Sequence, residues 1–136
     1  MSGRAGAVDD DAPKIESYRD LRVWQEAMAL AVACYHLTQG FPKEEMFGLT
    51  SQIRRSAASI AANIAEGYGR EHTRSFVQFL HVAQGSLKEL ETHLLLSERV
   101  IAAAANGASG ILSKCEIVGK MLRSLIRSLQ RREIGA

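Results

Sequence analysis

The sequence has little proline, few cysteines and no long apolar run. Two prolines stand among 136 residues, so almost nothing interrupts a helix, and no apolar stretch approaches the roughly 20 residues of a transmembrane helix. A chain of this length buries a core without disulfides or a structural metal. Cys34 and Cys115 each fall on the apolar stripe of an expected helix, which predicts buried, reduced thiols. We expect one domain and no membrane contact.

Acidic charge is concentrated at the start of the chain. Residues 1–16 include Asp9, Asp10 and Asp11 and have no periodic apolar pattern, which predicts a disordered acidic tail before a helical domain over residues 17–132. This start lacks the basic end and apolar core of a signal peptide, so we expect a cytoplasmic protein. The formal net charge is +2; because two cations oppose four carboxylates in residues 1–17, the remainder carries +4.

Apolar side chains recur at helical spacing through the rest of the chain. Alternating steps of four and three keep such residues on one face of a helix. The pattern predicts four helices, over residues 21–37, 43–66, 73–96 and 111–132. Ser17 and Ser109 are suited to cap the first and the last of them, and a turn begins at Gly67. We predict an all-α fold, an antiparallel up-down-up-down four-helix bundle.

The first helix is apolar over a wide arc. Its apolar residues cover roughly 200°, whereas a helix with one buried face needs little more than roughly 100°. Two explanations stay open: a second surface that meets another subunit, or a central helix covered on both sides within one subunit. In the first case, we expect Trp24 near the bundle core. The expected oligomer interface consists of Val23, Leu30 and Leu37.

The second helix carries more polar residues along its seam than stability alone favours. Four of them define a candidate polar network in the hairpin of the second and third helices: Arg55, Ser59, Asn63 and Glu66. Because buried polar groups need partners, the ordinary interpretation is interhelical hydrogen bonding to Gln84, Ser86 and Glu89, which fixes the register. The functional alternative is a small-ligand site at Asn63 and Glu66.

The fourth helix combines an apolar seam with a basic face. Four cations lie within about 80° of one another, directly away from the seam: Lys120, Arg123, Arg127 and Arg131. Such a row either supports the helix C-terminus and solubility, or binds the phosphate backbone of RNA or DNA. No exposed aromatic residues are interleaved for base stacking, so the row predicts no base-specific readout.

Catalytic and metal-binding patterns are missing from the sequence. The Glu-x-x-His pairs of di-metal bundles do not occur, and the histidines are too scattered to activate a serine or cysteine. Glu89 and His93 are one turn apart, but no second helix supplies further ligands. We predict no catalytic residue, no metal and no cofactor. The least favoured hypothesis is an enzyme or metal protein that uses Glu66, Glu89 and His93.

Residues of the central hairpin resemble those of one protein family. They are Phe41, Pro42, Gly48, Leu49, Gln52, Ile53, Arg54, Arg55, Ser59, Ile60, Asn63, Ile64, Ala65, Glu66, Gly67, Gly69 and Arg70, then Phe76, Phe79, Leu80, Ala83, Gly85, Ser86, Leu87, Glu89, Leu90 and Glu91. Over about residues 18–129, the chain resembles the four-helix-bundle proteins encoded by intervening sequences inside bacterial 23S ribosomal RNA genes. The resemblance implies a homopentameric ring. Distant relatives, which accompany the reverse transcriptases of diversity-generating retroelements, bind nucleic acid.

Two hypotheses of function follow from these patterns. The basic row and the resemblance favour a non-enzymatic, homo-oligomeric helical bundle that binds RNA or DNA through a basic surface. The alternative is a protein–protein adaptor or assembly scaffold without nucleic-acid contact, whose basic face only keeps it soluble. The position of the gene in some relatives does not show that this chain contacts ribosomal RNA.

Overall fold

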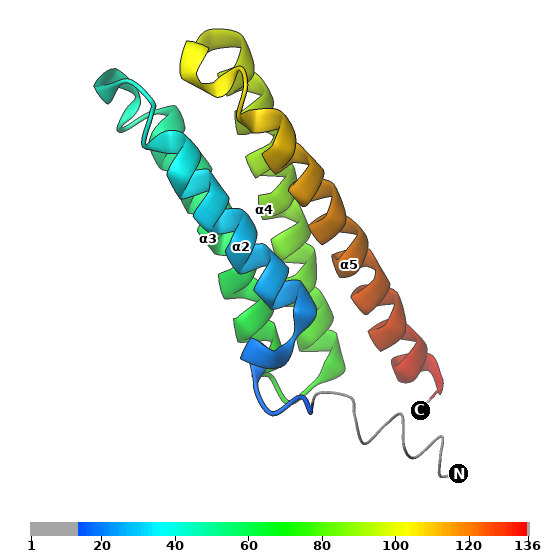
Figure 1. The fold of residues 1–136 in the computed structure, drawn as a ribbon. Helices are drawn as coiled ribbons and strands as arrows, with labels where there is room; N and C mark the ends of the chain where they lie inside the picture. Colours follow the sequence, from blue (N-terminus) through cyan, green and yellow to red (C-terminus); the bar gives the residue numbers. More distant parts are fainter. Residues whose placement is uncertain (1–13, 136) are drawn as a thin grey trace.

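A computed structural model describes residues 14–135, and these residues form helices and no strands (Figure 1). The α-helices are α2 (Arg22–Thr38), α3 (Leu49–Tyr68), α4 (Thr73–Val100) and α5 (Ala108–Gly135). Short 3₁₀ turns lie at η1 (Tyr18–Asp20), η2 (Lys43–Glu45) and η3 (Ala102–Ala104). The predicted all-α, up-down-up-down four-helix bundle is confirmed. Residues 1–13 of the expected tail lie outside the described residues.

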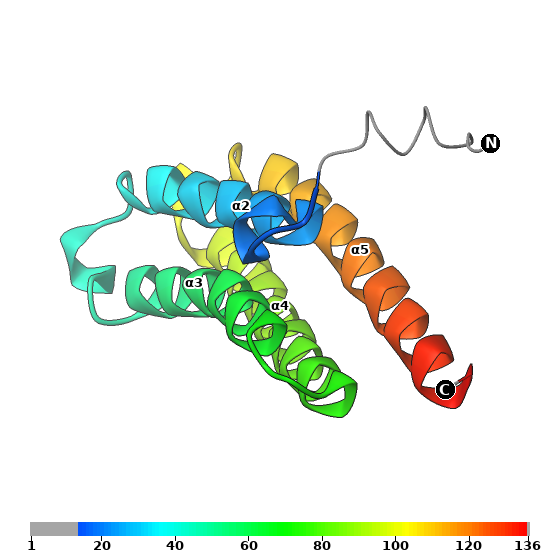
Figure 2. The same cartoon turned by 90° about the horizontal axis from the view of Figure 1, so that it is seen from below.

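The four helices pack in chain order around one core. Each of α2 and α4 contacts both α3 and α5, and the α3–α4 pair packs most extensively. α3 and α5 are diagonally opposite, and the C-terminal end of α5 diverges from α4 (Figures 1 and 2). The fully buried side chains are mostly leucine and isoleucine, including Leu30, Ile53, Ile60, Ile64, Leu80, Leu90, Leu94 and Leu122.

The caps differ in part from the expected ones. The Ser17 hydroxyl accepts a hydrogen bond from the backbone N–H of Arg19, and the Asp20 carboxylate accepts one from the backbone N–H of Ser17. Ser17 is therefore a cap as predicted and forms a capping box with Asp20, but it begins the 3₁₀ turn η1 and not α2 itself. Ser109, the expected cap of the last helix, lies within α5, which starts at Ala108.

Gly67 permits the close approach of α3 and α4. A Cβ atom at this position would lie 2.7 Å from the Cβ of Phe79 and 2.9 Å from the Cδ1 of Phe76. Real Cβ atoms do not approach other carbons so closely, because interiors are already packed to crystal-like density. Gly67 is therefore part of the α3–α4 contact, inside α3, and does not begin the turn as the sequence pattern suggested.

α2 turns a different face to the core than expected. Val23 and Leu30 are 5% and 0% exposed, so they belong to the subunit's own core. Leu37 is half-buried beside Gly107, where a Cβ atom would lie 2.7 Å from the Leu37 Cδ1. Burial of Val23 and Leu30 contradicts their place in the expected oligomer interface, whereas the place of Leu37 in it stays a prediction. The physical reason is that α2 packs between α3 and α5, and α5 covers this part of its apolar arc.

The other apolar row of α2 is the exposed one. Met28, Val32 and Tyr35 are 41%, 51% and 44% exposed. They form one wall of an apolar groove, and the opposite wall is made of small residues of α3: Ala58, Ala61, Ala62 and Ala65. Trp24, expected in the core, is half-buried in the same wall and stacks edge-to-face on Tyr18 with ring centroids 5.3 Å apart. We call this feature the α2/α3 groove.

Candidate nucleic-acid interface

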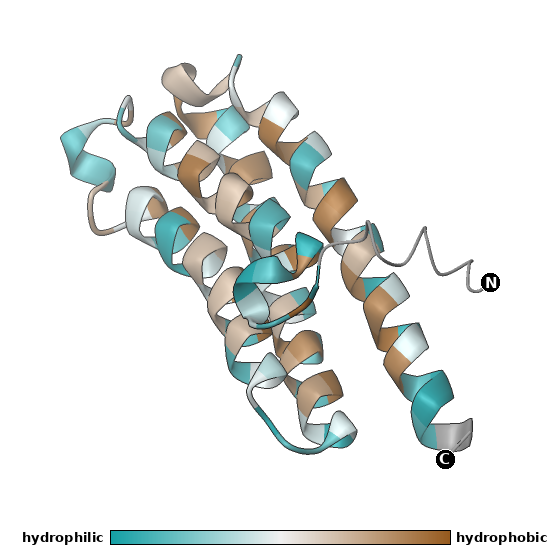
Figure 3. Cartoon of the chain, turned by 60° about the horizontal axis from the view of Figure 1, so that its bottom comes forward, coloured by the Kyte–Doolittle hydropathy of each residue, from teal (hydrophilic) through white to brown (hydrophobic). Residues whose placement is uncertain are grey.

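The four cations of the fourth helix lie together on the exposed side of α5. The opposite side is held against the bundle by buried Cys115, Val118 and Leu122, and all four cations are exposed. Helix α5 becomes hydrophilic in its last turns (Figure 3). The cations border a shallow depression of about 270 Å³, which Ser124 also lines. We call them the basic row: Lys120, Arg123, Arg127 and Arg131.

Charge within the basic row is uncompensated. None of the ion pairs among the described residues involves a member of the row. Neighbouring members are three or four residues apart, and like charges at this spacing destabilise a helix by roughly 0.2–0.5 kcal/mol per pair. The helix dipole stabilises cations only in the last turn, where Arg132 lies. It therefore does not explain why cations stand at Lys120 and Arg123, which lie earlier in the helix. A bound polyanion would relieve the repulsion along the whole row.

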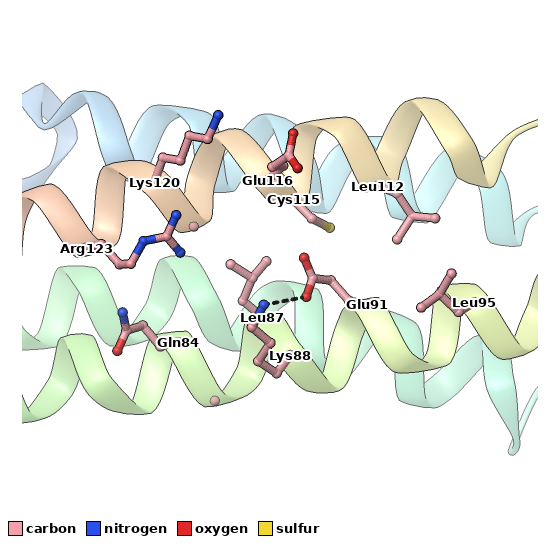
Figure 4. A pocket seen from close by; sticks show the side chains of 12 residues that line it. Gln84, Leu87, Lys88, Glu91, Leu95, Leu112, Cys115, Glu116, Lys120 and Arg123 are labelled. Carbon is pink, nitrogen blue, oxygen red and sulfur yellow. Dashed lines mark hydrogen bonds and ion pairs between the residues drawn. The ribbon is translucent and has the colours of Figure 1, made fainter.

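A groove between α4 and α5 opens directly beside the basic row. Its volume is about 750 Å³, and Lys120 and Arg123 line both this groove and the depression of the row. The Arg123 side chain extends into the gap between the helices near Leu87 (Figure 4). Farther along the gap, the Glu91 carboxylate accepts a hydrogen bond of 3.0 Å from the Lys88 ammonium. We call this feature the α4/α5 groove.

Two glycines lie on the walls of the α4/α5 groove. A glycine inside a helix costs about 0.8–1.0 kcal/mol relative to alanine, so each requires a reason. At Gly119, a Cβ atom would lie 3.3 Å from the Leu87 Cδ2, and this tight packing provides one. At Gly85, a Cβ atom would meet nothing within 4 Å. The sequence patterns above did not indicate the groove, although an isolated glycine in the middle of a helical pattern was the available signal.

The expected polar network is formed only around Ser59. The hydroxyls of Ser59 and Ser86 are 2.8 Å apart across the α3–α4 contact. The Asn63 Nδ2 donates to the Ser59 carbonyl oxygen at 2.8 Å and to the Ser59 hydroxyl at 3.0 Å. One hydrogen bond therefore crosses between the helices, and those of Asn63 stay within α3.

The two charged members of the expected network lie outside it. Glu66 accepts a hydrogen bond of 2.9 Å from the Arg70 Nη2 at the exposed end of α3. Arg55 is exposed and makes no hydrogen bond or ion pair with another side chain in the described part of the chain. Of the expected acceptors, Gln84 binds His81 within its own helix at 3.0 Å. Including Arg55 and Glu66 in the network was wrong, because at these positions α3 faces solvent and not α4.

The remaining reactive groups are buried or scattered. Cys34 and Cys115 are free thiols with no exposed surface, as predicted. Burial raises the pKa of each to about 12, so both stay protonated and unreactive near neutral pH. Within residues 14–135, no three histidine, cysteine, aspartate or glutamate side chains, Glu89 and His93 included, are placed to hold a metal ion. None of the helices described is long and apolar enough to cross a membrane.

The fold and its surface define a class: a small antiparallel four-helix bundle that presents a basic helix face and an adjoining groove. Residues 19–124 match the family described as 23S rRNA-intervening sequence protein. Since the match covers more than half of the chain, the chain belongs to this family, and the resemblance inferred from the hairpin residues is confirmed.

One solved structure of similar fold extends the comparison. It is a protein of unknown function from the S23 ribosomal protein family of Bacteroides thetaiotaomicron, with 26% sequence identity and a TM-score of 0.68. The similarity covers 76% of this chain and 97% of that chain. No curated protein matches the sequence. Neither the family nor the similar structure carries a described activity, and neither indicates a catalytic family.

Proposed function

We propose that this chain is a non-enzymatic, self-assembling helical bundle that binds the phosphate backbone of RNA or DNA through the basic row. The observation that carries the proposal is the row itself, four exposed cations on one side of α5 without carboxylate partners among the described residues. From Lys120 to Arg131 the row extends about 16 Å along the helix axis, which is long enough to meet several phosphates.

Self-assembly would repeat the basic row without covering it. The α2/α3 groove is a largely apolar surface that one subunit leaves exposed, and α5, which carries the row, does not border it. A second copy seated on that groove leaves the row open to solvent. The family resemblance suggests a ring of five, and five rows on one particle would convert weak phosphate contacts into avidity.

The test is a triple substitution, Arg123→Gln with Arg127→Gln and Arg131→Gln. Glutamine keeps helix propensity nearly constant, so folding should survive. Affinity for RNA and duplex DNA should fall for all sequences alike, and the slope of log affinity against log salt should shrink by roughly 0.7–0.9 for each phosphate that the variant no longer neutralises.

A matched control removes the same charge elsewhere. Lys43→Gln, Arg55→Gln and Arg99→Gln replace three exposed cations outside α5. This control should keep most of the affinity and the parental salt slope, because its charges act only at long range and are screened. If the control weakens binding as much as the row variant, net charge and not the row is responsible.

A second candidate function is a protein–protein adaptor. The observation in its favour is Phe47, which is 95% exposed between η2 and α3 and stands next to half-exposed Met46. Exposed apolar side chains grouped in this way are typical of protein contacts. A row variant with parental affinity and parental salt slope would support the adaptor function, and Phe47→Ser is then the first substitution to examine by sedimentation.

A further inference from the structure

We propose that the α4/α5 groove receives one unstacked base of a single strand whose phosphates lie on the basic row, and that Glu91 selects bases with an exocyclic amino group. This inference rests on the proposed function, because the row must first hold the strand. It adds a base preference that the row alone does not provide.

The groove has an anion-binding end and an acceptor end. Arg123 belongs to both the basic row and the groove, so a phosphate held by the row lies at the groove's entrance. The Arg123 side chain ends near Leu87, and Glu91 lies one helical turn beyond Leu87 along α4, about 6 Å of helix rise (Figure 4). Arg123 and Glu91 face the same gap but form no ion pair (Figure 4). A nucleotide carries its phosphate and the hydrogen-bonding edge of its base several ångströms apart, so it can satisfy both residues.

Glu91 is placed to accept a further hydrogen bond inside the groove. Its side chain is 22% exposed and points into the gap (Figure 4). Lys88 donates to its Oε1 at 3.0 Å, and its Oε2 has no hydrogen-bond partner among the described residues. A carboxylate oxygen accepts well from the amino group at C4 of cytosine. Uracil and thymine present a carbonyl oxygen at the same position, which a carboxylate repels.

The walls between these two ends suit a base. Leu95 and Leu112 line the groove beside buried Leu87, and their apolar carbons can cover the faces of an aromatic ring. The volume of about 750 Å³ lies in the range of small-molecule sites. Gly85 leaves one wall without a side chain, although nothing in the subunit occupies the space. Packing within the subunit does not explain a glycine at this position, whereas the space that a ligand needs would explain it.

The experiment compares two single strands whose bases differ only in the C4 group and the hydrogen on N3. Fluorescein-labelled 20-mers of deoxycytidine and of deoxyuridine are titrated at pH 7.5 and fixed salt, beside a duplex of equal length. The parent protein should bind the cytidine strand about tenfold more tightly, the effect of one hydrogen bond to a charged group. Glu91→Gln should bring the ratio of the two affinities to one, even if the substitution changes both affinities by a common factor.

A second variant fills the groove. Gly85→Leu should weaken binding of the cytidine strand and bring the ratio close to one, while duplex affinity stays unchanged because stacked bases do not enter the groove. Gly110→Leu is the matched control, since a Cβ atom there also meets nothing within 4 Å and Gly110 lies outside the groove. It should keep the parental ratio. Far-UV circular dichroism shows whether each variant is folded. If Gly85→Leu does not fold, the Glu91→Gln result decides the test.

The outcomes separate this inference from the proposed function. Equal affinity of the parent for the two strands overturns the base site and leaves phosphate binding by the row intact. A cytidine preference that persists in Glu91→Gln also overturns it. No binding of any of the three probes overturns both the base site and the proposed function.

Discussion

The contact at Gly67 predicts opposite effects of the same substitution at two helical glycines. Gly67→Ala places a Cβ atom 2.7 Å from the Cβ of Phe79, which is bonded directly to the backbone and cannot swing away. The Phe76 carbonyl oxygen, also backbone, lies 3.3 Å from the same point. Either α3 and α4 must separate locally or Phe79 must move with its helix. Overpacking of this kind costs about 1–3 kcal/mol.

Gly85→Ala is the matched substitution without the clash. Alanine is favoured over glycine in a helix by about 1 kcal/mol, and at Gly85 no neighbouring atom opposes the gain. The gain in helix propensity from alanine at Gly67 is no larger than the gain at Gly85, because Gly67 lies in the last turn of α3. We therefore expect Gly85→Ala to be more stable than Gly67→Ala by about 1–3 kcal/mol, and more stable than the parent by about 1 kcal/mol.

The assay is urea unfolding followed by far-UV circular dichroism. Each protein is measured at several concentrations, because self-assembly adds a concentration-dependent term to apparent stability. Unchanged m-values would show that the midpoints report stability and not a change in the unfolded chain. A Gly67→Ala midpoint equal to or above that of Gly85→Ala would refute the close α3–α4 contact at this position.

Three further predictions concern assembly, the thiols and the hairpin. Val32→Glu should keep helical content and shift the particle mass toward monomer in sedimentation, whereas Leu30→Ala should lower core stability by about 2–5 kcal/mol. Because folding raises the pKa of Cys34 and Cys115 from 9.0 to about 12, their contribution to stability is complete below pH 9 and falls as pH rises toward 12. The loss reaches about 1.4 kcal/mol per pH unit for each thiol, measured by denaturant midpoints, and neither thiol should react with iodoacetamide before unfolding. Asn63→Leu should leave particle mass unchanged, since its hydrogen bonds stay within α3; a changed mass would show that it fixes the register.

The four helices and the family were accessible from the sequence because both depend on local patterns. Steps of three and four place apolar residues on one face wherever the helix lies, so the seam of α5 and its opposite basic row could be read directly. Ser17 indicated a helical start for the same local reason. The hairpin residues that carried the family resemblance are likewise a matter of order and spacing.

The partner of each face was decided only by the tertiary structure. Periodicity assigns Val23 and Leu30 to one row of α2 and Trp24 and Met28 to another, but it does not say which row meets α5. For the same reason, the sequence pattern assigned Glu66 to the polar network. In the structure, α3 is oriented so that Glu66 faces solvent and binds Arg70. The α4/α5 groove depends on how far apart two helices stand, and that distance follows from the packing of all four helices together. A one-dimensional pattern therefore specifies the faces, and three-dimensional packing determines which of them are left open to bind.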